Sequence, residues 1–167
     1  KKSTGKHYAM KIQSKVSLLH NHSEDPSRAV RELHTFACCQ HPFIVNLDYA
    51  FQTETLAILV LELAAQDLNE SLLSSPDVRL DEERVRFYAA EIILALSYLH
   101  QQGLIYRDLK PQNVLLDAQG HVLLVDMGGC MDWGDRLTRV SSPLVQVDVT
   151  TDRGVSSVYS ETGGSDR

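Results

Sequence analysis

Four polar side chains gathered in residues 106–128 constrain this chain more than any other feature. Asp108, Lys110 and Asn113 share one short loop, and Asp126 follows on the next turn. A carboxylate such as Asp108 can accept a proton from a hydroxyl group, and Lys110 can sit beside a phosphoryl group in transfer. Asn113 and Asp126 supply the hard oxygen ligands that Mg²⁺ prefers. Phosphoryl transfer needs this combination, because its catalysis consists mostly of positioning and charge neutralisation.

The order and spacing of these residues resemble the catalytic loop and the metal-binding turn of protein kinases, H-R-D-L-x-x-x-N and D-F-G. Asn113 follows Asp108 by five positions, and Asp126 follows Asp108 by 18. A chance polar loop between two strands is the alternative, and so many agreeing positions make it weak. The resemblance implies that Asp108 is the catalytic base, that Lys110 steadies the transferred group, and that Asn113 and Asp126 bind Mg²⁺.

Composition sets the broad class of the protein. The chain has 167 residues, 43% of them apolar and 23% charged, which is enough for one globular domain with a sizeable core. The net charge of −6 argues against nucleic acid as a partner. Three cysteines form no paired framework and indicate reduced thiols, so we expect an intracellular, cytoplasmic protein. The sequence contains no apolar run of 18 residues and thus no expected membrane span.

The N-terminal third predicts a strand and a helix with an exposed loop between them. Residues 7–12 alternate as a strand, and Tyr8-Ala-Met-Lys11 resembles the V-A-I-K strand of kinases. The resemblance implies that Lys11 binds the α- and β-phosphates of ATP and that Ala9 lies over the adenine. A helix is predicted over residues 27–39, and the resemblance pairs its Glu32 with Lys11. Residues 13–27 are polar and predict an exposed loop.

The next segment carries the closest family likeness. Residues 41–53, His-Pro-Phe-Ile-Val-Asn-Leu-Asp-Tyr-Ala-Phe-Gln-Thr, resemble the AGC group, which holds the cyclic-nucleotide-dependent kinases and their relatives. Strands are predicted over 44–51 and 55–63, joined as a hairpin. The second strand should lead into the hinge between the two kinase lobes, where Ala65-Gln66 replaces the usual Gly-Gly with one residue fewer.

The resemblance also assigns the adenosine contacts. Leu61 would limit the depth of the adenine pocket, and Leu115 would form its floor. Glu62 and Ala64 would offer backbone groups to adenine, and Asp67 would lie near the ribose.

Two helices and a second hairpin complete the expected elements. A short helix is predicted over 67–75, and the longest helix over 82–101, with Asp81 as its N-cap. The core-facing stripe of the longer helix comprises Val85, Tyr88, Ile92, Leu96 and Leu99. Residues 114–116 and 122–125 predict paired strands. Met127 replaces the Phe of D-F-G and should pack near Phe36.

We therefore expect an α+β fold like the bilobal protein kinase fold, but incomplete. Residues 1–63 would form part of the N-lobe, 64–140 part of the C-lobe, and 141–167 a divergent, disordered tail. The Gly-rich phosphate loop would precede residue 1, and further C-lobe helices would follow residue 140. Because those helices would cover the apolar stripe of residues 82–101, this chain should be marginally stable without them.

The expected function is that of a fragment of a serine/threonine protein kinase. The parent enzyme would transfer the γ-phosphoryl group of Mg·ATP to a protein hydroxyl, and this chain alone is expected to be inactive. In the family, a lysine at position 110 accompanies preference for Ser or Thr. A truncated pseudokinase is the alternative, acting as a nucleotide-binding or protein-interaction module without catalysis. A small-molecule kinase with the same fold is a third reading, which the AGC-like residues 41–53 disfavour.

Overall fold

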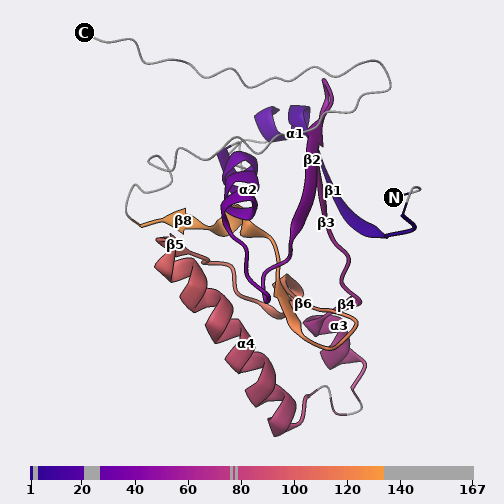
Figure 1. The fold of residues 1–167 in the computed structure, drawn as a ribbon, viewed down its shortest axis with the longest axis vertical. Helices are drawn as coiled ribbons and strands as arrows, with labels where there is room; N and C mark the ends of the chain where they lie inside the picture. Colours follow the sequence, from indigo (N-terminus) through magenta and orange to yellow (C-terminus); the bar gives the residue numbers. More distant parts are fainter. Residues whose placement is uncertain (2–3, 21–26, 76, 78, 134–167) are drawn as a thin grey trace.

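The computed structural model describes residues 1, 4–20, 27–75, 77 and 79–133. Figure 1 shows an upper part, built from a sheet with helix α2 (Ser27–Cys38) beside it, and a lower part that contains helices α3 (Leu68–Leu73) and α4 (Glu82–Gln101). This mixture of an antiparallel sheet with separate helices is the expected α+β class. The predicted tail over 141–167 lies outside the described residues.

The upper sheet consists of β1 (Tyr8–Ser14), β2 (Leu47–Gln52) and β3 (Leu56–Glu62), in the order β1-β3-β2 and antiparallel throughout. Strand β3 lies in the middle, and its residues from Ile58 to Leu61 are buried, as its apolar sequence predicts. The predicted hairpin of β2 and β3 is therefore confirmed.

The segment that follows β1 differs from the prediction. The strand continues to Ser14, and a short helix α1 (Lys15–His20) follows at once, so an exposed loop over residues 13–20 is wrong. The backbone N–H of Lys15 donates to the carbonyl of Thr55 at 2.8 Å, and its Nζ bonds the carbonyl of Thr53 at 2.6 Å. These tertiary contacts fix the start of α1 against the β2–β3 turn.

The lower part holds several short elements around the long helix. A second sheet has the order β4-β6-β7, and a two-stranded ladder joins β5 to β8. Two single 3₁₀ turns, η1 and η2, interrupt the chain before β6 and after β7. The bounds of these strands and turns are β4 (Gln66–Asp67), β5 (Leu104–Ile105), η1 (Pro111–Asn113), β6 (Val114–Leu116), β7 (Val122–Leu124), η2 (Met127–Gly129) and β8 (Met131–Asp132).

The residues before β2 join the two parts of the fold. The prediction starts that strand at Ile44, but β2 begins at Leu47. Ile44 instead forms an isolated parallel bridge with Leu124, and the N–H of Val45 donates to the carbonyl of Leu124 at 3.0 Å. Both residues are buried, and the backbone of residues 43–45 bonds β7, since the N–H of Leu124 also donates to the carbonyl of Phe43 at 2.9 Å.

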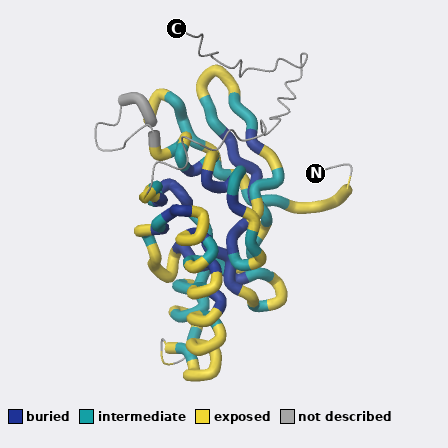
Figure 2. Tube along the Cα trace, turned by 60° about the vertical axis from the view of Figure 1, so that its left-hand side comes forward, coloured by how far each residue is buried: buried dark blue, intermediate teal, exposed yellow. Residues whose placement is uncertain are grey.

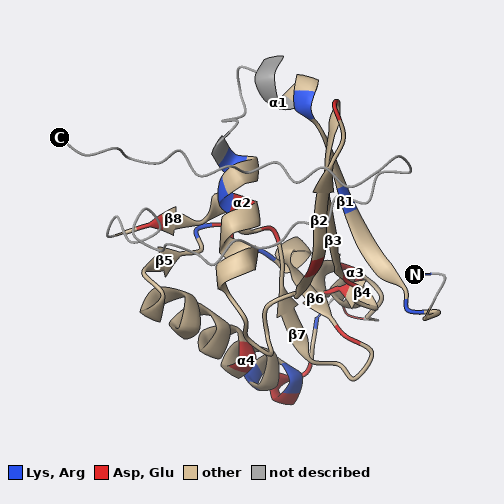
Figure 3. Ribbon diagram, turned by 45° about the horizontal axis from the view of Figure 1, so that its top comes forward, with Lys and Arg blue, Asp and Glu red and all other residues tan. Residues whose placement is uncertain are grey.

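Helix α4 begins and ends as predicted, but part of its predicted core face is exposed. Asp81 caps it, since its Oδ1 accepts from the N–H of Arg84 at 2.9 Å. Leu99 is fully buried, whereas Val85 is 48% exposed, so the described residues cover only part of the predicted stripe. The N-terminal end of α4 extends past the packed elements and is exposed in Figure 2. Charges of both signs gather there in Figure 3.

The core lies between α2, the central strands and the C-terminal half of α4. Phe36 and Met127 both belong to it, with 3% and 0% of their surface exposed, which confirms the predicted burial of Met127. Within the described ranges, every helix is too short or too polar to cross a membrane.

Candidate active site

Three charged side chains from distant parts of the sequence meet at one point. Lys11 comes from β1, Glu32 from the middle of α2, and Asp126 from the residue just before η2. Lys11 Nζ lies 2.6 Å from Glu32 Oε1 and 3.3 Å from Asp126 Oδ1. The ion pair implied by the kinase resemblance is therefore present, and the lysine also reaches the metal-ligand candidate.

Burial differs sharply between the two partners of this pair. The side chain of Glu32 is 2% exposed, and that of Lys11 is 34% exposed. Burial raises the pKa of Glu32, and the hydrogen bond from Lys11 opposes that rise. Lys11 thus compensates a buried carboxylate while its ammonium group stays open to solvent, and so to a ligand.

The catalytic-loop candidates form a second cluster around Asp108. Lys110 Nζ lies 3.1 and 3.0 Å from the two carboxylate oxygens of Asp108. Asn113 Nδ2 donates to the backbone carbonyl of Asp108 and to its Oδ2, both at 2.9 Å. The hydrogen bond from Lys110 lowers the pKa of Asp108, with Asn113 adding to the effect. Asp108 is therefore an ionised acceptor near neutral pH, and the Oδ1 of Asn113 is left for another partner.

Two backbone conformations at this site are strained. Arg107 has φ 65° and Asp126 has φ 53°, a left-handed region that residues other than Gly seldom adopt. Arg107 Nε donates to the carbonyl of Gly129 at 2.8 Å. A Cβ on Gly129 would lie 3.1 Å from the Cβ of Asp108, so a side chain there would push the two loops apart by a few tenths of an ångström. Strain of this kind clusters at functional sites.

A buried tyrosine connects the start of the Asp108 loop to the residue just before Asp126. Tyr106 is 1% exposed, and its hydroxyl donates to the carbonyl of Val125 at 2.5 Å. Burial raises the pKa of Tyr106 well above its ordinary range, so the hydroxyl keeps its proton. Sequence reasoning missed this role, because a tyrosine in place of the usual histidine carries no sign of its partner.

The adenosine candidates lie in two sheets that the hinge connects. Ala9 pairs with Leu61 across β1 and β3, and Glu62 pairs with Tyr8 in the same ladder. Asp67 pairs with Leu115 across β4 and β6.

Two of these candidates have structural partners of their own. The Oδ1 of Asp67 accepts from the N–H of Glu70 at 2.7 Å and caps α3, a role that sequence reasoning did not assign. The backbone of the hinge continues into the second sheet, since the N–H of Ala65 donates to the carbonyl of Leu116 at 2.8 Å. Ala64 thus lies at the junction between the two sheets.

The donor set suits Mg²⁺ more than a metal held wholly by protein. Among the described residues, no group of three or more His, Cys, Asp or Glu side chains could hold a metal ion. Mg²⁺ is usually bound by one or two protein oxygens, with waters and substrate phosphates completing its shell. Asp126 and Asn113 provide such a pair, at the two ends of the β6–β7 hairpin that lie next to the Asp108 loop.

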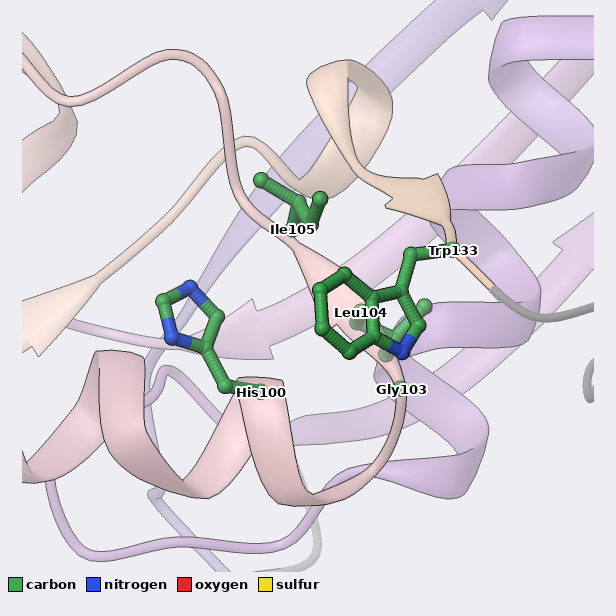
Figure 4. A pocket seen from close by; sticks show the side chains of 5 residues that line it. All are labelled: His100, Gly103, Leu104, Ile105 and Trp133. Atoms are coloured by element: carbon green, nitrogen blue, oxygen red, sulfur yellow. The ribbon is translucent and has the colours of Figure 1, made fainter.

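A separate apolar hollow lies at the C-terminal end of α4. Its volume is about 190 Å³, and Figure 4 shows the indole of Trp133 over Leu104 beside it. None of the predicted site residues lines it; the lining residues are His100, Gly103, Leu104, Ile105 and Trp133.

Known proteins are similar to this chain in sequence. The family described as protein kinase domain matches residues 1–152. A RAC family serine/threonine-protein kinase homolog of Dictyostelium discoideum is 43% identical over 134 residues, which cover 79% of this chain and 29% of that protein. Human ribosomal protein S6 kinase alpha-2 is 47% identical over 125 residues, which cover 74% of this chain and 16% of that protein.

The chain therefore spans less than a third of the length of these relatives. Their names agree with the expected resemblance to the AGC group. Because the family match covers most of the sequence, the chain belongs to the protein kinase family.

Proposed function

We propose that this chain carries the nucleotide-binding and catalytic-loop portion of a serine/threonine protein kinase, which transfers the γ-phosphoryl group of ATP to a protein hydroxyl. The observation that carries the proposal is the meeting of Lys11, Glu32 and Asp126 at one point. These residues come from three separate elements, and a structural ion pair alone would need only two of them. Residues 1–63 would form part of the N-lobe, and 64–140 part of the C-lobe.

Each side chain has a role that follows from its contacts. Lys11, oriented by Glu32, would hold the α- and β-phosphates with its solvent-facing ammonium group. Asp108, ionised and fixed by Lys110 and Asn113, would orient the acceptor hydroxyl and accept its proton. Lys110 would then face the transferred group and offset its charge.

Asn113 and Asp126 would hold Mg²⁺ through their oxygens. When bound, the ion neutralises charge on the phosphate oxygens during transfer. The protein contributes the fixed placement of the ligands, because the N–H of Val125 donates to the carbonyl of Asn113 at 3.1 Å and joins the two segments. The strained backbone at Asp126 directs its carboxylate toward Lys11.

Adenine would lie between the two sheets, with Ala9 above it and Leu115 below. Leu61 would close the back of the pocket, while the backbone of Glu62 and Ala64 would bond the base and Asp67 the ribose. The pairings of β1 with β3 and of β4 with β6 support this arrangement, since they set these residues on both sides of the hinge.

The acceptor would be a Ser or Thr of a protein. Two observations support this: the relatives are named serine/threonine-protein kinase and ribosomal protein S6 kinase, and Lys110 contacts Asp108. A net charge of −6 supports a partner other than nucleic acid. Cys39 and Cys130 are free, buried thiols, which supports a reducing, cytoplasmic setting.

Calorimetry on the full chain tests the nucleotide-binding part of the proposal. Wild-type protein should bind Mg·ATP, and Lys11→Met should weaken that binding about tenfold or more, because a charge-assisted phosphate contact is lost. Lys15→Met is the matched control, since Lys15 Nζ bonds the carbonyl of Thr53 instead. Lack of Mg·ATP binding by the wild type would refute the proposal.

Transfer to a Ser-containing peptide, measured with this segment inside a complete kinase domain, separates the kinase from the alternative function. Asp108→Asn should reduce transfer on the order of 10²-fold or more while leaving Mg·ATP binding nearly unchanged, since the base acts only in the chemical step. Asp77→Asn, which changes an exposed aspartate, is its control. Clear Mg·ATP binding with no transfer would favour a nucleotide-binding module without catalysis.

A further inference from the structure

Glu91 is an acidic residue in the buried face of α4, and none of the roles above uses it. It is 5% exposed and lies one turn before Ala95, which is fully buried, as is Leu99 one turn further on. An ionised carboxylate in such surroundings is unfavourable unless its oxygens find partners. The contacts of Glu91 therefore indicate what it does.

Both oxygens of Glu91 bind the start of β7. Oε2 accepts a hydrogen bond from the backbone N–H of Val122 at 2.8 Å, and Oε1 lies 2.6 Å from Nδ1 of His121. Val122 is 0% exposed, so its N–H has no access to solvent and depends on this carboxylate.

These contacts replace a neighbouring strand along β7. One edge of β7 pairs with β6. On the opposite edge, the N–H of Leu124 donates to the carbonyl of Phe43 at 2.9 Å, and the N–H of Val122 donates to Glu91. The loop before β2 and the side chain of Glu91 thus bond the edge of β7 that is not paired with β6, at two positions along the strand that are two residues apart.

The hairpin held in this way carries both metal-ligand candidates. Asn113 directly precedes β6, and Asp126 comes two residues after β7, so both lie at the end of the hairpin remote from its turn. Glu91 holds the turn end. We propose that Glu91 is a positioning residue, which fixes the β6–β7 hairpin against α4 and thereby sets Asn113 and Asp126 apart by the distance that a divalent cation needs. This inference rests on the proposed function.

The test measures divalent-cation binding separately from nucleotide binding. Mn²⁺ serves as the probe and is titrated by electron paramagnetic resonance into the full chain with a non-hydrolysable ATP analogue. Calorimetry in EDTA gives the affinity for the same analogue without metal. Glu91→Leu should weaken Mn²⁺ binding about 10-fold to 100-fold, as loss of an outer-shell partner does. Affinity in EDTA should change by less than about twofold, because Lys11 and the hinge are unaffected.

Two further variants control for charge and for the loss of an acid. Glu91→Gln keeps an oxygen that can accept from Val122, so Mn²⁺ affinity should stay within about threefold of wild type. Glu83→Leu removes an exposed acid from the same helix and should change neither affinity. If Glu91→Leu does not fold, Glu91→Asp replaces it, because its shorter side chain withdraws the carboxylate from Val122.

The outcomes separate the two proposals. Unchanged Mn²⁺ affinity in Glu91→Leu, or in Glu91→Asp if that variant is used, overturns the positioning role. Equal losses of Mn²⁺ affinity and of affinity in EDTA also overturn it, because a purely structural residue would lower both. A wild-type chain that binds neither probe overturns the proposed function and the positioning role together.

Discussion

The two charges of the Lys11–Glu32 pair are buried to different extents, so removing one should destabilise the fold far more than removing the other. Lys11→Met leaves Glu32, with a side chain 2% exposed, as a carboxylate without its cation. Glu32→Gln leaves a lysine that is 34% exposed and keeps Asp126 at 3.3 Å. We therefore expect the first variant to be much less stable than the second.

The magnitude follows from the proton that Glu32 would have to bind. In Lys11→Met, burial raises the pKa of Glu32 further above its ordinary value of 4.5, and the folded protein can bury it as the neutral acid. At pH 7, keeping the proton on Glu32 costs about 1.36 kcal/mol for each of the about 2.5 pH units above 4.5. The loss of stability therefore has a ceiling of about 3.4 kcal/mol. At pH 5 the same reasoning gives about 0.7 kcal/mol.

The sign of the pH dependence is fixed by the same argument. Above pH 4.5 the unfolded chain releases the proton of Glu32, while folded Lys11→Met retains it. The penalty of Lys11→Met therefore grows as the pH rises and shrinks as the pH falls toward 4.5. For Glu32→Gln we expect about 1 kcal/mol or less at either pH, because the lysine stays solvated.

Urea unfolding of the full chain at pH 5 and pH 7 checks this prediction. The free energies of unfolding of Lys11→Met and Glu32→Gln are compared with wild type at each pH, and Lys15→Met controls for the added methionine. The reasoning is refuted if the penalty of Lys11→Met is the same at both pH values. It is also refuted if Glu32→Gln proves the more destabilising change.

Two other predictions concern single hydrogen bonds. Tyr106→Phe leaves the carbonyl of Val125 without its buried donor and should lower the free energy of unfolding by about 1–3 kcal/mol in urea; an unchanged value would show that solvent or another donor replaces the hydroxyl. The hydrogen bond to Glu91 raises the pKa of His121 above its ordinary value of 6.5. The stabilisation that this hydrogen bond gives the fold is full below pH 6.5 and is lost as the pH rises through the raised pKa of His121. His121→Gln should therefore flatten the dependence of the melting temperature on pH above about pH 6.5, and an unaltered slope would contradict this.

The sequence predicted the long-range pair of the site and the longest helix for different reasons. Asp81 and Gly103 mark the two ends of α4 by local chemistry, an N-cap and a glycine with φ 80°. No local pattern links Lys11 to Glu32, which lie 21 positions apart. Their pairing was found through the family resemblance, which carries information about the tertiary fold.

The features that were missed depend on contacts between distant residues. Helix α1 is short and has no strong start signal, and contacts with the β2–β3 turn stabilise its first residue. Ile44 and Val45 belong to an apolar run, and such a run does not reveal which strand its backbone will bond. Glu91 is an acid at a core-facing position of α4, yet only the structure supplies Val122 and His121 as its partners.

The left-handed backbone at Arg107 and Asp126 sets fold stability against activity at these two positions. Glycine would relieve steric strain on the order of 1 kcal/mol at each, but would remove a side chain that contacts Gly129 or Lys11. A library of this chain selected only for resistance to proteolysis should accumulate glycine or asparagine at both positions. The same library selected for nucleotide binding should retain aspartate at 126. Comparing the two selections would locate, without a bound ligand, the residues at which the chain gives up stability for its chemistry.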